Sequence, residues 1–389
     1  MKILKNILSL GFLFLLSNMY GQNNSDLLTT ELKKHFEQSD LPGFAVSVVN
    51  EKGILYQQEF GYANKEEKRL FSTNTVENLG SVSKTVVGLA LIKAIEDEKI
   101  SLETKISDYL PFNVINPYYP DSPILVRHLA NHTSSILDTK NYGKSYILAE
   151  NTTNTENVHQ DFLNFISNHK KIPMEIFLSN ILEKGGDWYK KKNYLKSKPG
   201  TEHEYSNLNA ALVALIIEKA TGVSFKEYTK NKIFEPLKMT STSWSIQETS
   251  INNFATNYFP NGQIVPRYNL ITYPDGGLYS SVSDLSQYLN EIIKAYSGKS
   301  DFLKPEYAKL LLPGDEDENR AFWGMGQKSR NIGHGGSDPG VQTDLQFNAD
   351  SKIGRIIITN VNAEDNENLW RQYRQIHNII AKYESKFEQ

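Results

Sequence analysis

Cysteine is absent from the 389 residues of this sequence. Disulfide bonds, thiolate nucleophiles and cysteine-ligated metal sites are therefore excluded. A strong charge of one sign is also lacking, since the formal net charge is -3. Nucleic-acid-binding proteins usually carry a basic patch, so nucleic acid is not an expected partner. Among the histidines, only His128 and His132 stand at helix spacing, and we interpret His132 as a core or supporting residue. We expect no metal and no cofactor.

Long apolar runs are missing except near the N-terminus, where Ile7 to Leu16 follow a basic start. This run is too short to span a bilayer comfortably, and small or polar residues follow it. The pattern predicts a signal peptide over residues 1–21, cleaved before Gln22. A retained membrane anchor is the alternative interpretation. We expect a mature chain without a membrane span, located in the periplasm or secreted.

The rest of the chain shows strand signals near both ends and helix signals between them and at the close. Alternating or β-branched stretches with a short connection are typical of a β-hairpin, and repeats of three and four are typical of helices. In the last helix, the apolar side chains lie on one face that should pack on a sheet. The expected strands are Gly43–Asn50, Ile54–Tyr62, Val341–Asn348 and Ile353–Val361; the expected helices are Ser81–Glu98, Asn209–Thr221 closed by Gly222, and the segment that carries Leu369, Tyr373, Ile376, Ile380, Tyr383 and Phe387.

This order predicts an α+β fold. We expect an antiparallel sheet flanked by helices and built from both chain ends, with a mainly helical lobe inserted between them. The α/β lobe is placed at residues 25–99 and 266–389, and the helical lobe at residues 100–265. Both belong to one domain over residues 22–389.

The first reactive motif is the S-x-x-K of Ser81 to Lys84. Residues i and i+3 share a helix face, so the hydroxyl and the amine can meet. A serine needs a nearby base to become a nucleophile, and a desolvated lysine can serve as one. The motif alone does not identify a site, because Ser167 to Lys170 match it too. The alternative for Ser81 is a helix N-cap beside a solvated lysine.

Two further motifs follow. Tyr205 and Asn207 form a Y-x-N, in which the tyrosine can act as a general base and the amide can bind a carbonyl. His334, Gly335 and Gly336 form the H-x-G of the chain. Glycines on a strand edge let a substrate backbone approach closely. The alternative for this motif is a glycine turn with a surface histidine.

In this order the three motifs resemble those of the serine β-lactamase and penicillin-binding protein family, of the class C β-lactamase, DD-peptidase and related esterase type. The resemblance covers nearly the whole mature chain and implies a β-lactamase/transpeptidase-like fold. Supporting signatures occur in the same order: Leu41–Gly43, Phe60–Ala63, Leu129–Ile136, Lys198–Gly200, Phe234–Met239, Gly276–Ser281 and Gly333–Val341.

The resemblance also implies roles for individual residues. Ser81 attacks and forms an acyl-enzyme, and Lys84 and Tyr205 share the role of base. Asn207 positions the substrate, and the backbone N–H groups of Ser81 and Ser337 form an oxyanion hole. Which base takes the first proton stays open, because closely coupled groups titrate as a unit.

Three residues depart from the family pattern. His334 stands where many relatives have lysine, Gly335 where they have threonine, and Ser135 where they have glycine. The first two changes remove a cation and a hydroxyl that hold a substrate carboxylate. We therefore expect a monomeric esterase or D-peptidase acting on a small-molecule ester, amide or peptide. A β-lactamase or DD-carboxypeptidase, a penicillin-binding sensor and an acyltransferase are the alternatives.

Residues 139–198 are additional sequence between the family signatures. They end in a lysine-rich stretch, Gly185 to Lys198. Long insertions in compact domains often serve function, so this segment could form a lid or a substrate rim. The alternative is a solvated surface loop.

Overall fold

The computed structural model describes residues 24–150, 157–246, 253–314 and 320–387. The predicted signal peptide, residues 1–21, lies outside these ranges. A helix covers residues 24–37. No single helix in the described ranges is long and apolar enough to cross a membrane, although two helical segments that meet at 85°, Asn207–Thr221 and Phe225–Phe234, would qualify together.

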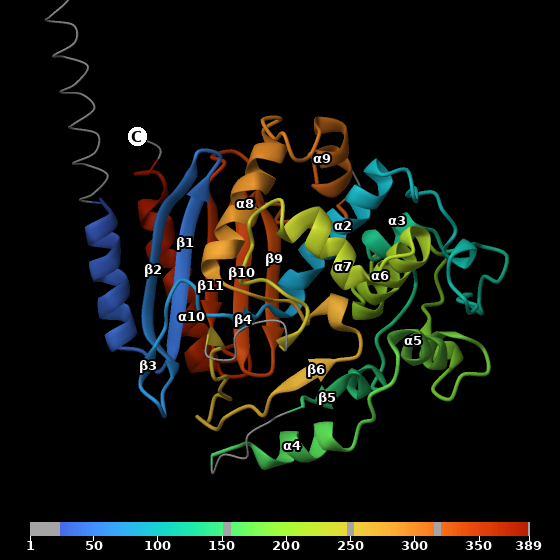
Figure 1. Ribbon diagram of the computed structural model, residues 1–389, viewed down its shortest axis with the longest axis horizontal. Coiled ribbons are helices and arrows are strands. Elements are labelled where there is room, and N and C mark those ends of the chain that lie inside the picture. The colour runs from blue at the N-terminus through green and yellow to red at the C-terminus, as the bar shows by residue number, and fades with distance from the viewer. Residues whose placement is uncertain (1–23, 151–156, 247–252, 315–319, 388–389) are drawn as a thin grey trace, which may run out of the picture.

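A seven-stranded sheet forms the centre of the molecule (Figure 1). Every neighbouring pair in it is antiparallel. Strands from the two chain ends meet where β1 pairs with β11, which confirms a sheet built from both ends. The order across the sheet is β3 (Arg69–Leu70), β2 (Gly53–Asn64), β1 (Gly43–Asn50), β11 (Gly354–Thr359), β10 (Val341–Asn348), β9 (Asn331–Asp338) and β8 (Gly324–Met325).

The sheet is covered on both faces because successive side chains of a strand point to opposite sides. In β1, Phe44 and Val46 pack in one cluster with residues of the 24–37 helix and of α10 (Glu367–Glu384). Ala45 and Val49 belong to the other cluster, which contains α8 (Val282–Tyr296) and α2 (Ser83–Glu96). The predicted apolar face of the last helix is confirmed.

The segment between the two halves of the sheet is mainly helical (Figure 1). Its central helix, α6, is buried on all sides from Leu208 to Ile217 and ends at Gly222, whose φ of 72° suits glycine. The proposed boundaries of this lobe, residues 100–265, stay a prediction. This segment contains α3 (Val126–Ala130), α4 (Gln160–Ser167), α5 (Met174–Leu182), α6 (Asn207–Thr221) and α7 (Phe225–Thr229). Its short strand β5 (Tyr146–Leu148) pairs with β6 (Tyr268–Leu270), which lies just after residue 265.

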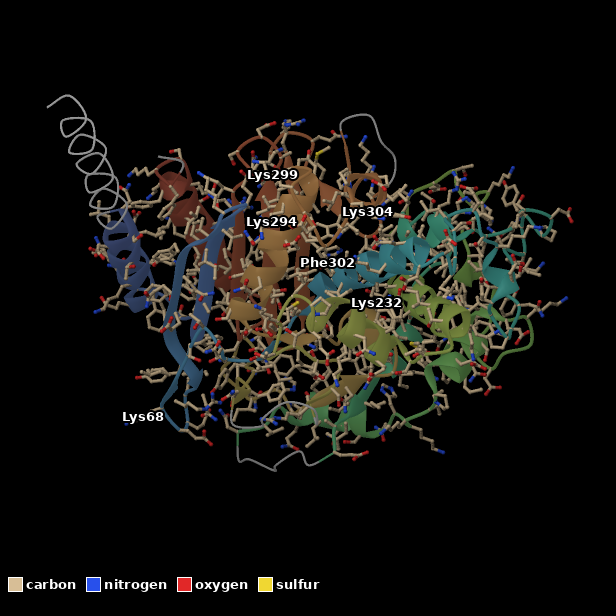
Figure 2. The ribbon with its side chains drawn as sticks, turned by 45° about the horizontal axis from the view of Figure 1, so that its top comes forward. Lys68, Lys232, Lys294, Lys299, Phe302 and Lys304 are labelled. Atoms are coloured by element: carbon tan, nitrogen blue, oxygen red, sulfur yellow. The ribbon has the colours of Figure 1, made fainter. Side chains whose placement is uncertain are left out.

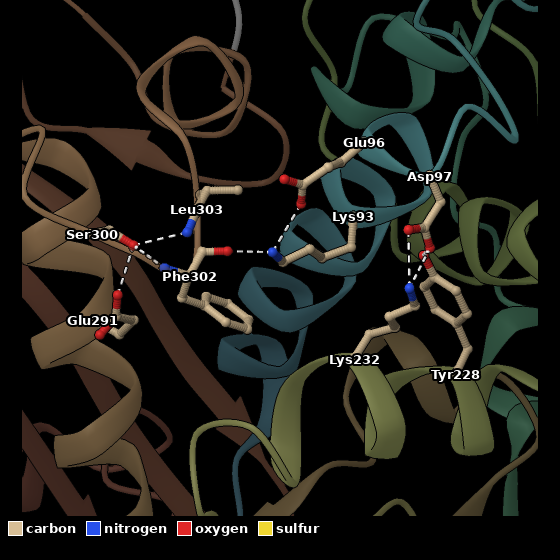
Figure 3. Close-up of polar contacts among 9 residues, drawn as sticks. All are labelled: Lys93, Glu96, Asp97, Tyr228, Lys232, Glu291, Ser300, Phe302 and Leu303. Carbon is tan, nitrogen blue, oxygen red and sulfur yellow. Dashed lines mark hydrogen bonds and ion pairs between the residues drawn. The ribbon is translucent and has the colours of Figure 1, made fainter.

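Helix α2 is fixed at its C-terminal end by polar contacts to both lobes (Figure 3). Lys93 donates to the Glu96 carboxylate at 2.9 Å and to the carbonyl oxygen of Phe302. Asp97, just past the helix, pairs with Lys232 at 2.8 Å. These contacts hold the axis of the helix whose opposite end carries Lys84.

Lysines gather on the same side of the molecule, around Phe302 (Figure 2). Lys294 lies 3.4 Å from the carboxylate of Glu291, and Lys299 lies 2.6 Å from that of Glu51. These charges are locally balanced, so we interpret this surface as a solvated face.

Candidate active site

Ser81 lies in a 3-10 turn, η1 (Gly80–Val82), and the α-helix begins two residues later at Ser83. The expectation that the α-helix starts at Ser81 is therefore wrong. The backbone folds into this turn because Gly80 adopts φ 50°, in the left-handed region. A Cβ at Gly80 would lie 3.0 Å from the backbone nitrogen of Ser337. Glycine thus allows the serine turn to approach strand β9 closely.

The side chain of Asn78 holds this turn from the other side. Its Oδ1 accepts a hydrogen bond from the N–H of Gly80 at 2.7 Å, and its Nδ2 donates to the carbonyl of Gly276 at 3.1 Å. Asn78 is buried, so both bonds are shielded from water. The position of Ser81 is therefore set by hydrogen bonds to the backbone of its turn, independently of the side chains that contact its hydroxyl.

Lys84 and Tyr205 both reach the oxygen of Ser81. Lys84 Nζ lies 2.9 Å from Ser81 Oγ, and the Tyr205 hydroxyl lies 2.8 Å from the same atom. Lys84 is fully buried and also donates to the carbonyl oxygen of Asp275. The structure thus brings together three residues that the sequence motifs singled out, from positions 124 residues apart.

Tyr205 sits in a non-helical segment held by His132. The His132 backbone carbonyl accepts from the N–H of Glu204 at 2.8 Å, and its Nδ1 accepts from the N–H of Ser206 at 3.2 Å. The His132 and Tyr205 rings lie 4.6 Å apart. Burial, assisted by the charge of Lys84, holds the pKa of His132 well below its usual value. His132 is therefore a neutral hydrogen-bond acceptor that supports the segment carrying Tyr205. This agrees with the interpretation of His132 as a core or supporting residue.

Asn207 is engaged by Asp138, a residue that the sequence motifs did not identify. The carboxylate of Asp138 accepts from Asn207 Nδ2 and from its backbone N–H, both at 2.8 Å. It also accepts from the Ser206 hydroxyl at 2.8 Å and from the N–H of Leu208 at 3.3 Å. A carboxylate in this position caps the N-terminus of α6 and complements its dipole. One Nδ2 proton of Asn207 is thus committed to Asp138, and its second Nδ2 proton and its Oδ1 can bind a further partner.

Strand β9 carries His334, Gly335, Gly336 and Ser337. A Cβ at Gly336 would lie 2.2 Å from the carbonyl oxygen of Leu79, so only glycine permits β9 to pass the serine turn. At Gly335 the nearest atom to such a Cβ is 3.9 Å away, and a side chain fits there. Packing against the serine turn therefore requires glycine at position 336 but not at position 335.

The edge of β9 beyond Gly333 faces the serine turn. β8 pairs only with Ile332 and Gly333 of this strand. Together with the 3.0 Å approach between a Gly80 Cβ and Ser337 N, this places the Ser337 backbone beside that of Ser81. Two backbone N–H groups in such a position are the usual donors of an oxyanion hole.

A cavity of about 370 Å³ opens beside Tyr205 and His334. Burial, and secondarily the Lys84 charge, lowers the pKa of His334 to about 4, so this imidazole is neutral at pH 7. Its Nδ1 lies 2.5 Å from the Gly335 carbonyl oxygen. The remaining lining residues are Ala130, His132, His203, Arg320, Phe322, Trp323, Gly324, Met325, Gly333 and Gly335.

The other sequences that match the S-x-x-K and Y-x-N motifs lie away from this cavity. Ser167 ends helix α4, Tyr62 lies in β2 and Tyr288 in α8. Ser135 adopts φ 66°, which explains why a glycine suits that position. The lysine-rich stretch contributes no residue to the cavity lining within the described chain. Instead, its Tyr194 is buried and donates to the carbonyl of Leu182 at 2.6 Å.

Metal ligation has no candidate in the ranges that the structure describes, because no group of three or more histidine, cysteine, aspartate or glutamate residues is arranged to hold an ion.

The chain belongs to the beta-lactamase family, whose family model matches residues 28–378. It is 22% identical over 345 residues to Protein flp of Staphylococcus aureus strain MRSA252, covering 87% of this chain and 63% of that protein. It is 27% identical over 339 residues to Penicillin-binding protein 4* of Bacillus subtilis strain 168, covering 81% of this chain and 67% of that protein. The chain thus spans less than two thirds of the length of the first of these relatives.

Two solved structures share the fold. The octameric penicillin-binding protein homologue from Pyrococcus abyssi superposes with a TM-score of 0.68 at 24% identity, over 86% of this chain and 73% of that one. The beta-lactamase/D-alanine carboxypeptidase from Pseudomonas syringae gives a TM-score of 0.65 at 18% identity, over 93% and 99%. These likenesses confirm the α+β fold with its antiparallel sheet.

Proposed function

We propose that this chain is an exported serine hydrolase that cleaves an ester or amide through an acyl-enzyme on Ser81. The supporting observation is the convergence of Lys84 Nζ and the Tyr205 hydroxyl on Ser81 Oγ, at 2.9 and 2.8 Å. A serine hydroxyl becomes a strong nucleophile when an adjacent group takes its proton. These two side chains are within hydrogen-bonding reach of that proton.

In the proposed cycle, Ser81 Oγ bonds to the substrate carbonyl carbon while its proton passes to the Lys84–Tyr205 pair. The carbonyl oxygen becomes an oxyanion, which accepts from the backbone N–H groups of Ser81 and Ser337. The pair then protonates the leaving alcohol or amine as the acyl-enzyme forms. Water repeats the sequence in the second half, and Ser81 regains its proton. The second Nδ2 proton of Asn207 can bind a substrate carbonyl, and its Oδ1 can accept from a substrate amide N–H.

The polarity of the cavity supports a substrate without a carboxylate beside the scissile bond. Binding such a carboxylate takes charged donors, of the bidentate or charge-assisted kind. His334 is neutral at pH 7, since its pKa is lowered to about 4 by burial. Gly335 offers no side-chain donor. Apolar groups from Phe322, Trp323 and Met325 line the cavity instead, which suits a neutral acyl or alkyl group.

One observation favours a second candidate, a peptidase for substrates that end in a D-residue carboxylate. Arg320 is exposed and lines the same cavity, and its guanidinium could supply the missing cation. The Bacillus subtilis relative is a penicillin-binding protein, and the Pseudomonas syringae protein is described as a beta-lactamase/D-alanine carboxypeptidase. A carboxylate-dependent specificity constant would select this candidate.

We also propose that the enzyme acts as a monomer on a small molecule in the periplasm or outside the cell. The support for export is the basic and apolar pattern of residues 1–21. Fractionation of cells that express the full chain, compared with a chain that starts at Gln22, tests this proposal. Recovery of both forms in the cytoplasm would contradict it.

The nucleophile is tested by covalent labelling with a fluorophosphonate. We expect Ser81→Ala to abolish labelling and Ser167→Ala, the matched S-x-x-K serine, to leave it unchanged. Undiminished labelling of the Ser81→Ala protein would refute the assignment. Sustained turnover of a chromogenic ester identifies a hydrolase. A single burst without turnover identifies a penicillin-binding sensor, and acceptor-dependent product an acyltransferase.

A further inference from the structure

Gly276 lies against the two backbone segments that carry the proposed oxyanion donors. A Cβ on Gly276 would be 3.8 Å from the carbonyl carbon of Gly80, the residue before Ser81. It would be 3.0 Å from Oδ2 of Asp338, the residue after Ser337 at the end of β9. Gly276 therefore marks one side of the reactive serine.

Two carboxylates flank Gly276, and we call Asp275, Gly276 and Asp338 together the Gly276 corner. Asp275 ends the 3-10 turn η8 (Tyr273–Asp275), and its backbone carbonyl accepts a hydrogen bond from Lys84 Nζ. Both carboxylates are buried within the protein. Because a buried polar group without a partner costs free energy, these side chains need hydrogen-bond donors from inside the protein.

The insertion, residues 139–198, supplies these donors through two tyrosines. Tyr142 begins the 3-10 turn η3 (Tyr142–Ser145) and donates to Asp275 Oδ1 at 2.8 Å. Tyr146 begins β5 and donates to Asp338 Oδ1 at 2.5 Å. Their rings contact each other edge to face, with centroids 6.3 Å apart. The insertion thus anchors two aromatic side chains at the Gly276 corner.

Strand β6 packs behind the ring of Tyr146. Tyr146 stands opposite Leu270 in the β5–β6 pair, and its ring lies 5.5 Å from the ring of Tyr268. Leu270 Cδ1 would itself be 3.2 Å from a Cβ on Gly276. A molecule that reached these rings would have to displace packed side chains, which costs free energy. The rings therefore form a packed wall beside Gly276.

In the proposed cycle, the position of the proton donor decides which side of Ser81 takes the leaving group. The donor has to lie within hydrogen-bonding reach of the leaving alcohol or amine. Tyr205, which shares that proton with Lys84, lines the cavity of about 370 Å³. The cavity is therefore the side of the leaving group.

The other two substituents of the reacting carbon then have fixed directions. Its oxygen points to the backbone N–H groups of Ser81 and Ser337. Its acyl chain leaves the carbon on the side away from Tyr205, because the other two directions are taken. Within the described ranges, no residue of the insertion or of η8 lines the cavity. The Gly276 corner therefore lies outside the cavity, beside the oxyanion donors, where the acyl chain is directed.

We propose that Tyr142 and Tyr146 limit the length of the acyl group that Ser81 accepts. The Gly276 corner receives the acyl group, and the two anchored rings close it after a few carbon atoms. This inference rests on the proposed function and deepens it, because it names short-chain acyl esters and amides as the substrate class.

The reaction itself is that of the proposed cycle. In acylation, Ser81 Oγ bonds to the acyl carbon and its proton passes to the Lys84–Tyr205 pair. The bond to the leaving group breaks as the pair protonates that group. In deacylation, water bonds to the acyl carbon, and the bond to Ser81 Oγ breaks as Oγ regains a proton. The products are a short carboxylic acid and the leaving alcohol or amine.

The experiment measures kcat/KM for p-nitrophenyl acetate, butyrate and octanoate, which share one leaving group and differ in acyl length. We expect the parent protein to cleave the octanoate at least about tenfold less efficiently than the better of the two short esters. A parent protein that cleaves the octanoate as well as the short esters would overturn the proposal.

Substitutions of the two tyrosines test the role of their rings. Tyr142→Ala and Tyr146→Ala remove a ring and should each raise the ratio of octanoate to acetate kcat/KM by at least about tenfold. Tyr142→Phe and Tyr146→Phe are the matched controls, since they remove only the hydroxyl, and they should keep the ratio of the parent protein. The ratio does not depend on the fraction of protein that is folded, so a variant that folds poorly still reports it. An unchanged ratio in both alanine variants, or an equal rise in the phenylalanine variants, would overturn the proposal.

This outcome is separable from failure of the proposed function. If Ser81→Ala still hydrolyses the esters, the acyl-enzyme assignment falls, whatever the two tyrosines do. If Ser81→Ala abolishes hydrolysis and the alanine variants of Tyr142 and Tyr146 keep the ratio of the parent protein, only the role of the tyrosines falls.

Discussion

The ammonium of Lys84 lies 5.2 Å from the centre of the Tyr205 ring, and both side chains bond to one serine oxygen. A cation over an aromatic ring is attracted to its electrons, and an ammonium close to a phenol favours the ionised oxygen. The two residues therefore act together on the same serine oxygen.

This relationship predicts how their substitutions combine. Lys84→Ala and Tyr205→Phe should each lower kcat/KM by at least about a hundredfold, the usual scale for loss of a general base. The double variant should be little worse than either single variant, because residues that act as a unit are not additive. Steady-state kinetics on one ester, with far-UV circular dichroism as a folding check, measure this.

Tyr62→Phe is the matched control for that series, since Tyr62 heads a second Y-x-N sequence in β2. It should leave kcat/KM within about twofold of the parent value, because its hydroxyl has no part in the site. Fully multiplicative losses in the double variant would show that Lys84 and Tyr205 work in separate steps.

The substrate preference follows from His334 and Gly335. A site that lacks one charged hydrogen bond loses about 1.5 to 3 kcal/mol, or about ten- to a hundredfold in kcat/KM. We expect a neutral ester to be cleaved at least as well as its matched analogue with a carboxylate beside the scissile bond. His334→Lys with Gly335→Thr should move the preference towards the carboxylate form, and a side chain at Gly335 has room.

Substitution of Arg320 tests the opposite outcome, a preference for the carboxylate ester. If the parent enzyme strongly prefers the carboxylate ester and Arg320→Gln abolishes that preference, the cavity takes its cation from Arg320 and the D-peptidase candidate is selected. Kinetics on the same ester pair give both answers.

The sequence predicted the parts of the molecule that depend on local patterns. The hairpin of β1 and β2, the helix α6 with its Gly222 end, and the apolar face of α10 are confirmed, because residue periodicity records which face is buried. The start of α2 was placed two residues early, since a 3-10 turn and an α-helix share the same local sequence signals.

The supporting residues of the site could not be predicted in the same way. Asp138 bonds to Asn207 across 69 positions and Tyr142 to Asp275 across 133, so no local spacing connects them. A lone aspartate or tyrosine in a loop is ordinarily solvated. Only the three-dimensional path of Asp138 and of the insertion that follows it brings these side chains to their partners.

The two glycines of the β9 motif should respond differently to alanine. Gly336→Ala places a Cβ 2.2 Å from the carbonyl oxygen of Leu79 and 2.3 Å from Thr343 Oγ1. Such overpacking costs about 1 to 3 kcal/mol, so the thermal midpoint and labelling of Ser81 should both fall. Gly335→Ala, whose Cβ would be 3.9 Å from its nearest neighbour, is the control and should keep the parent midpoint. Equal midpoints for the two variants would contradict the close approach of β9.

The buried carboxyl group of Glu77 should make the stability of the folded protein depend on pH. Burial raises its pKa to about 8, against a partial offset by hydrogen bonds from Asn257 and the N–H of Asn78. The folded state therefore holds a proton that the unfolded chain has already released. Its contribution to stability is complete below about pH 4.5 and is lost as the pH rises to about 8.

Glu77→Gln removes this titration and keeps an acceptor oxygen for both donors. Relative to the parent protein, its thermal unfolding midpoint should rise progressively between pH 5 and pH 8. The two proteins should differ least at the lowest pH. A difference that stays constant across this range would contradict the raised pKa.

The pairing of the two chain ends bears on when the enzyme becomes active during its synthesis. Thr359 Oγ1 donates to the carbonyl of Gly43 across 316 positions, and β9 is joined to β1 only through β10 and β11. A ribosome that adds about 5 to 20 residues per second makes Ser81 on the order of tens of seconds before it makes Ser337. Throughout that interval the nascent chain carries its nucleophile without the strand that completes the oxyanion side. If the chain is the proposed hydrolase, its activity requires strand β9, and we expect a chain that is terminated before Ser337 to be inactive.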